Sequence, residues 1–215
     1  MKRELNPKML YFGTPVVLVS SLNSDGSTNV APMSSAWWVG NTAMLGMSAS
    51  SQTVRNLQER PLCVLNLVDE QMVDAIDRIA LLTGRPEVPD YKAARGYSYA
   101  ADKFAAAGLT PECYGPGKPA GVAESPIQME GQVQAMHPID GEGSRLRAIE
   151  VAVLHTHVDE ALLMANHQNY IDPLRWNPLF MKFTEYFSGA TLTRPSSLAR
   201  GWEMPKLEVI AAAGN

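Results

Sequence analysis

The chain has little cysteine, no excess of positive charge and no long hydrophobic run. Its two cysteines, Cys63 and Cys113, stand far apart and form neither a C-x-x-C pair nor a disulfide framework. The net charge of -4 argues against nucleic acid as the main partner, because phosphate backbones favour a basic face. No apolar run approaches the roughly 18 residues that cross a membrane, and residues 1–7 carry no apolar signal segment. We therefore expect a cytoplasmic protein with no membrane or nucleic-acid partner.

Apolar residues make up 46% of the 215 positions, which is enough for the core of one domain. β-Branched and apolar runs gather toward both ends and predict strands over 15–22, 27–31, 43–47, 61–68, 127–134 and 146–157. Helical patterns lie between them, over 70–82 and 99–107. We expect one mainly β domain with helices (α+β) over 1–215, with its core at about 10–190 and a C-terminal tail at 195–215. This order predicts an antiparallel barrel closed by strands of both halves, with the helices packed outside it.

The stretch from Ser48 to Asn56 is chemically the most distinctive part of the chain. Four hydroxyl side chains lie within six positions: Ser48, Ser50, Ser51 and Thr53. They precede a short predicted helix, whose first N–H groups and dipole favour an anion, and Arg55 adds a full positive charge. These groups together describe a phosphate cradle. The plain alternative is an ordinary helix cap made by Ser50 or Ser51.

Several segments, in their order and spacing, resemble the flavin reductase family. They are TPVVLVS at 14–20, NSDG at 23–26, NVAPMSS at 29–35, SASSQTVRN at 48–56, VLN at 64–66, DKFAAAGLT at 102–110, AESPI at 123–127 and IDP at 171–173. The match runs from about residue 15 to residue 186. The resemblance implies an FMN-binding split β-barrel, typically a homodimer that binds flavin at the subunit interface.

The resemblance also implies which residues hold the flavin. The phosphate would sit against Ser48, Ser50, Ser51 and Thr53, with Arg55 close by and Asn56 reaching the ribityl chain or the phosphate. The isoalloxazine ring would lie along Ala31, Pro32, Met33, Ser34, Ser35 and Ala36. Pro32 has no N–H, so this segment should bulge or follow a sheet edge and leave backbone groups free for the ring. Lys103 is a candidate second cation, with a solvated surface lysine as the alternative. Of Trp37 and Trp38, at most one faces the flavin, because neighbouring strand residues point to opposite faces.

Candidates for a role near the substrate are weaker. His155 and His157 share one face of a predicted strand, but no third and fourth ligands accompany them, so we expect no metal. A structural histidine is the alternative for each. Tyr186 could border the flavin from the partner subunit, or it could pack in the core.

The expected activity is that of a flavin-dependent oxidoreductase. FMN would accept a hydride from NADH or NADPH and pass electrons to a second acceptor, either a small molecule or a partner monooxygenase. The chain has no G-x-G-x-x-G after a strand, and no arginine in the sequence stands out as a reader of the ribose phosphate, so both nucleotides stay open. The alternatives are an FMN electron carrier of flavoredoxin type and a binding protein for another planar ligand such as haem. A pyridoxamine-phosphate-oxidase-like enzyme is more distant.

Overall fold

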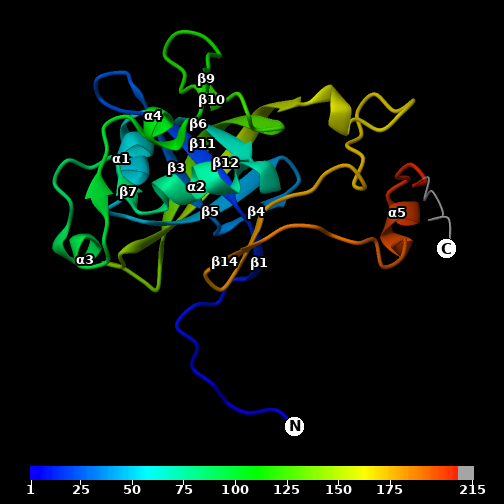
Figure 1. The fold of residues 1–215 in the computed structure, drawn as a ribbon, viewed down its shortest axis with the longest axis horizontal. Helices are drawn as coiled ribbons and strands as arrows, with labels where there is room; N and C mark the ends of the chain where they lie inside the picture. Colours follow the sequence, from blue (N-terminus) through cyan, green and yellow to red (C-terminus); the bar gives the residue numbers. More distant parts are fainter. Residues whose placement is uncertain (208–215) are drawn as a thin grey trace.

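The structure is a computed structural model, and it describes residues 1–207 (Figure 1). Its main sheet has seven antiparallel strands in the order β3-β2-β6-β11-β12-β5-β4. In chain order they are β2 (Val17–Leu22), β3 (Thr28–Met33), β4 (Ala36–Val39), β5 (Thr42–Ser48), β6 (Leu62–Leu67), β11 (Ile127–Ile139) and β12 (Leu146–Val158). The mainly β architecture and the contribution of both halves of the chain to one sheet are therefore confirmed.

The two end strands of this sheet are consecutive in the chain. β3 ends at Met33 and β4 begins at Ala36, so only Ser34 and Ser35 connect opposite ends of the sheet. Because three backbone steps span about 10 Å at most, the sheet must curl until its ends nearly meet. β3 and β4 do not pair with each other, so the barrel stays open along one seam, and the fold is a split barrel. The split β-barrel that the resemblance implies, with strands from both halves of the chain, is therefore confirmed. Pro32 is tolerated because β3 is an edge strand.

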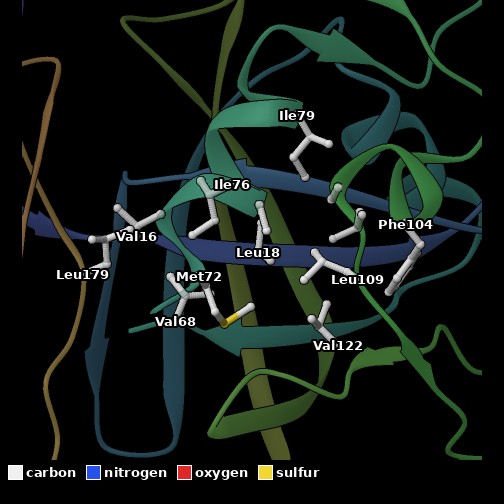
Figure 2. Close-up of a cluster of buried hydrophobic side chains, with 13 residues drawn as sticks. Val16, Leu18, Val68, Met72, Ile76, Ile79, Phe104, Leu109, Val122 and Leu179 are labelled. Atoms are coloured by element: carbon white, nitrogen blue, oxygen red, sulfur yellow. The ribbon is translucent and has the colours of Figure 1, made fainter. Parts of the chain in front are cut away.

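The helices pack around the barrel in two ways. On the outside, α2 (Val73–Ala80) and α4 (Lys103–Ala107) cover the outer face of β2 and β3. Figure 2 shows Leu18 of β2 within this cluster, between Ile76 of α2 and Leu109. The other main helix, α1 (Gln52–Glu59), contributes Val54 and Leu57 to the cluster that fills the barrel interior. The prediction of helices outside the barrel thus holds for α2 and α4, whereas α1 belongs to the interior core.

The predicted helix over 99–107 was too long. Ser98–Tyr99 forms strand β8, which pairs in parallel with β7 (Leu82–Thr83). The helix begins only after Asp102, whose carboxylate accepts from the Ala105 N–H at 2.9 Å, and it ends at Gly108 in the left-handed conformation (φ +70°). The helix expected over 70–82 is present as a 3₁₀ turn, Glu70–Met72, followed by α2.

Shorter elements complete the fold. They are β1 (Phe12–Pro15), β13 (Phe180–Lys182) and β14 (Glu185–Phe187) in one small sheet, β9 (Pro111–Glu112) paired with β10 (Gly121–Val122), α3 (Asp90–Ala93), the 3₁₀ turn Glu160–Leu162, and α5 (Ser197–Gly201). α5 lies well away from the barrel (Figure 1). The last part of the expected tail, 208–215, lies outside the described residues. Within residues 1–207, no helix is long and apolar enough to cross a membrane.

Candidate functional site

A cleft of about 680 Å³ opens at the barrel seam. Its floor is the connection between β3 and β4, and one wall is the turn from β5 into α1. Further lining comes from residues 80–97, which connect α2 to β8 and contact this turn through Tyr91 and Ser50, and from α4. The fold thus places a concave site at the point where its main sheet is interrupted.

Most of the residues predicted to hold the flavin lie in this cleft. From the ring segment they are Ala31, Pro32, Met33, Ser34 and Ser35, and from the phosphate segment they are Ser48, Ser51 and Thr53, together with Lys103. Tyr186 lines the same cleft from β14. Segments separated by up to 155 positions therefore meet at one site.

The sequence left two interpretations open for the turn before α1, a helix cap and a phosphate-binding turn, and the structure has groups for both. Ser51 caps the helix, because its hydroxyl accepts from the Val54 N–H at 3.2 Å. Ser48 and Ser50 are free of that task, and their hydroxyls lie 3.0 Å apart. Ser50 also meets the hydroxyl of Tyr91 at 2.7 Å, which lowers the pKa of that tyrosine. The helix is capped by Ser51, and the Ser48 hydroxyl beside the cap lines the cleft.

Four predicted residues lie at the margin of the cleft or outside it. Ala36 is buried in the barrel interior, and Ser50 stands just behind the cleft lining. Arg55 points from the exposed face of α1 into solvent. Asn56 is 2% exposed and donates to Ser21 Oγ at 3.1 Å and to Asn23 Oδ1 at 2.9 Å, so its amide anchors α1 to the β2–β3 hairpin.

Lys103 is the most unusual group in the cleft. It stands at the start of α4 and is only 3% exposed, yet its ammonium makes no hydrogen bond or ion pair within residues 1–207. Burial, with a smaller contribution from the charge of Lys92, lowers its pKa from 10.5 to about 8. A buried cation without an anionic partner is costly, unless the partner is a ligand. The surface-lysine alternative is therefore wrong.

The sequence did not reveal the other cations of the cleft, which are Lys92, Arg95 and Arg145. Lys92 and Arg95 come from the segment around α3, and Arg145 precedes β12, far from both in sequence. No carboxylate lines the cleft in the described part of the chain. The cleft is thus strongly positive in a protein whose net charge is -4, and this contrast appears only when the chain is folded.

The floor of the cleft offers hydrogen-bonding groups for a flat ligand. The Ser35 carbonyl accepts from the Gly46 N–H at 2.7 Å, and the Ser35 hydroxyl meets the Tyr11 hydroxyl at 2.8 Å. A Cβ on Gly46 would lie 3.0 Å from the Cβ of Ser35, so glycine allows the connection to pass close to β5. One edge of β3 pairs with β2, and its other edge faces the seam with backbone groups free for a ring.

These features fit the flavin that the resemblance implies. The volume lies in the range of about 300–1,000 Å³ that is usual for small-molecule sites. Hydroxyls, the start of α1 and the buried Lys103 match the phosphate, and the floor from Ala31 to Ser35 matches the ring.

The histidine candidates lie elsewhere. Neither His155 nor His157 lines the cleft. His157 stacks on Tyr114 with ring centroids 4.7 Å apart, and its Nε2 lies 3.0 Å from Glu130, which also pairs with Lys118 at 2.7 Å. Within residues 1–207, no group of three or more His, Cys, Asp or Glu side chains is placed to hold a metal.

The two tryptophans do not line the cleft either. Trp38 packs against the interior cluster, whereas Trp37 is 56% exposed on the outer face of the sheet. The alternation of strand side chains is as predicted, and neither indole faces the cleft within this chain. Tyr186 is half-buried there, and burial raises its pKa.

The split barrel and its positive, hydroxyl-lined cleft define a flavin-binding type of protein. Comparison with known proteins gives the family. The model of the flavin reductase like domain matches residues 9–174, so the chain belongs to the flavin reductase like family. The uncharacterized protein YdfE of Bacillus subtilis (strain 168) is 35% identical over 185 residues, which cover 86% of this chain and 88% of YdfE.

Two solved structures show the same fold. The flavoredoxin of Desulfovibrio vulgaris (Miyazaki F) superposes with a TM-score of 0.73 at 20% identity, covering 93% of this chain and all of that one. Nitrilotriacetate monooxygenase component B from Bacillus cereus superposes with a TM-score of 0.71 at 21% identity, covering 91% of this chain and 99% of that one. A flavin cofactor and an oxidoreductase-type function follow from the family.

Proposed function

We propose that this protein is an FMN-dependent oxidoreductase that takes a hydride from NADH or NADPH and passes electrons to a second acceptor. The observation that carries the proposal is the seam cleft, which is lined by the buried Lys103 and by a hydroxyl-rich turn, with no carboxylate in its lining among the described residues. Bound FMN would supply the hydride-accepting chemistry of its ring. A location in the cytoplasm stays a prediction.

The residues of the chain itself would bind the flavin and orient its ring. Ser48, Ser51 and Thr53, with the N–H groups at the start of α1 and Lys103, would hold the phosphate. Ser34, Ser35 and the free edge of β3 would hydrogen-bond the polar edge of the ring. For Arg55 and Asn56 the geometry favours other roles, namely solvation and anchoring of α1. His155 and His157 could act only at a site that lies outside this cleft.

We further propose a homodimer. Trp37 and Val39 on β4 are exposed by 56% and 67%, and the strand registers place both on the outer face of the sheet. Leu154, at the β-bulge of the neighbouring β12, is 50% exposed. Exposed apolar groups that share one face are characteristic of an interface. A partner subunit seated there would cover them.

The second acceptor is a small molecule or a partner monooxygenase. Nitrilotriacetate monooxygenase component B is by its name one component of a monooxygenase, and its fold is the same. This likeness motivates the proposal of a partner oxygenase that receives reduced flavin.

The first test is the visible absorption spectrum of the purified protein before and after FMN is added, followed by anaerobic NADH or NADPH. The proposal predicts a flavin band that bleaches with a nicotinamide donor. A flavin band that persists with both donors would favour an electron carrier of flavoredoxin type over a reductase. If added FMN does not bind, as judged by quenching of its fluorescence, the proposal fails.

A pair of variants, each lacking one positive charge, tests whether FMN binds in the cleft. Lys103→Met should weaken FMN binding by tenfold or more, because a charge-assisted contact to phosphate contributes about 1.5–3 kcal/mol. Arg60→Ala removes one positive charge at the far end of α1, outside the cleft, and should leave binding unchanged. Equal losses in both variants would mean that the cleft is not the flavin site.

A further inference from the structure

The cleft carries more positive charge than a flavin phosphate requires. Its lining contains Lys92, Lys103, Arg95 and Arg145, and no carboxylate in the part of the chain that the structure describes. A phosphate monoester carries a charge of about -1.5 to -2 at neutral pH. Of the four cations only Lys103 is buried in the described structure, and together they exceed the charge of one phosphate by about two.

The excess cations lie at the mouth of the cleft and on two separate elements. Lys92 and Arg95 belong to the segment 84–97, which contains α3 and is held at both ends by the pairing of β7 with β8. Arg145 belongs to a different element, and its carbonyl accepts from the Ala49 N–H at 2.8 Å beside the hydroxyl-rich turn. Tyr91 contacts the same turn, with its hydroxyl 2.7 Å from that of Ser50, and the charges of both Lys92 and Arg145 help to lower its pKa.

Aromatic rings accompany these cations. After α3 the chain turns back at Gly96 (φ +84°), and the Tyr97 N–H donates to the Lys92 carbonyl at 3.1 Å. This turn places the Lys92 ammonium 5.4 Å from the centroid of the Tyr97 ring. Tyr91, 39% exposed, is held against the turn by its bond to Ser50. The mouth therefore combines two ring faces with three cations.

We propose that Lys92, Arg95 and Arg145 form a second anion subsite that binds the phosphate monoester on the adenosine of the electron donor, so that the protein prefers NADPH to NADH. The proposal rests on the proposed function and adds to it the choice of donor. An arginine near the adenosine ribose is the usual partner of this extra phosphate. The tyrosine rings offer a stacking surface to the adenine, which a small inorganic anion or a simple carboxylate would not use.

Binding without turnover is the first test. The full chain loaded with FMN is titrated with adenosine 2′,5′-bisphosphate and with adenosine 5′-monophosphate, which lacks the second phosphate. We expect the bisphosphate to bind at least about tenfold more tightly, with a difference that shrinks between about 0.05 M and 0.5 M salt, because exposed charges are screened. Equal affinities at low salt overturn the proposal. The titration is repeated without FMN, so its outcome does not depend on the proposed reaction.

Variants then separate the subsite from the flavin site. Arg95→Ala and Arg145→Ala should bring the ratio of kcat/KM for NADPH and NADH toward one, mainly through KM for NADPH, and should leave the Kd for FMN within twofold. Arg60→Ala, outside the cleft, should preserve the ratio. If the arginine variants lose FMN and keep the ratio, these cations belong to the flavin phosphate and the proposal is wrong. Absence of any nicotinamide oxidation would instead refute the proposed function, while the bisphosphate titration still decides on the subsite.

Discussion

At the scale of single residues, Lys103 decides how the cleft responds to pH. The residue is 3% exposed within residues 1–207, and its pKa is lowered to about 8, chiefly by burial. Only the protonated form attracts phosphate. We expect the affinity for FMN to be constant below pH 8 and to fall above it, by at most tenfold per pH unit. Lys103→Arg, which keeps its charge at high pH, should bind FMN with little pH dependence up to about pH 9.5. Fluorescence titrations from pH 6.5 to 9.5 measure the Kd for FMN of both proteins. If the wild type and Lys103→Arg show the same pH dependence, Lys103 does not bind the phosphate.

The same lysine predicts an effect on the stability of the flavin-free protein. Its folded pKa lies below the unfolded value, so between about pH 8 and 10.5 the unfolded chain binds more protons, and this group makes stability rise with pH. Below pH 8 the full penalty applies, on the order of 3 kcal/mol at ~1.4 kcal/mol per pKa unit. Lys103→Met should therefore stabilise the flavin-free protein at pH 7 while weakening flavin binding. Urea unfolding of the wild type and of Lys103→Met without FMN tests this prediction. If the variant is less stable than the wild type, the charge of Lys103 does not destabilise the flavin-free protein.

At the scale of elements, α1 has separable structural and binding groups. The Ser51 hydroxyl satisfies the Val54 N–H, whereas the Ser48 hydroxyl lies 3.0 Å from the Ser50 hydroxyl and does not cap the helix. Ser51→Ala should lower the free energy of unfolding by about 1 kcal/mol, the usual cost of losing an N-cap. Ser48→Ala should leave stability within about 0.5 kcal/mol and weaken FMN binding. Chemical denaturation and flavin titration of the two variants distinguish a serine that caps the helix from one that binds the phosphate. Equal destabilisation would mean that both serines act as caps.

Strand β11 has a glycine, Gly131, at a position where a side chain would collide with residues of the barrel interior. A Cβ at Gly131 would lie 2.5 Å from Val151 Cγ1 and 3.4 Å from Cys63 Sγ, both in the interior cluster. Gly131→Ala should destabilise the fold by about 1–3 kcal/mol through overpacking. Gly201→Ala, which has nothing within 4 Å, is the control and should be nearly neutral. Thermal unfolding of both proteins is the measurement. A neutral Gly131 variant would show that the interior can expand.

The sequence predicted those elements whose signal is local. Alternation and turn residues were enough for β2, β3 and β12, and the Ser-rich turn showed the start of α1. The helix before Gly108 was overestimated, because alanine favours a helix everywhere and the pairing of Ser98–Tyr99 with β7 is a long-range contact. For the same reason Lys92, Arg95 and Arg145 escaped attention, since each is ordinary in sequence and they meet only across the folded cleft.

At the scale of the whole molecule, the outer face of β4 and β12 predicts the oligomeric state. Trp37 is more than half exposed there, beside Val39. We expect sedimentation to show a dimer, and Trp37→Glu to shift it to monomers by placing an unpaired charge in the contact. Leu198→Glu, on exposed α5 and outside that face, is the control. A wild-type monomer at micromolar concentration would remove the proposed interface.

The pairing of β5 with β12 sets the order in which the protein can form during its synthesis. β5 ends at Ser48 and its partner begins at Leu146, so roughly 100 residues must be added before this ladder can close. At about 5–20 residues per second, a ribosome takes ~5–20 s over that interval. During this time the hairpins β2–β3 and β4–β5 are present in the nascent chain with unpaired edges and apolar faces. We expect chaperones that recognise such segments to engage the first 70 residues, and to be released when β12 emerges.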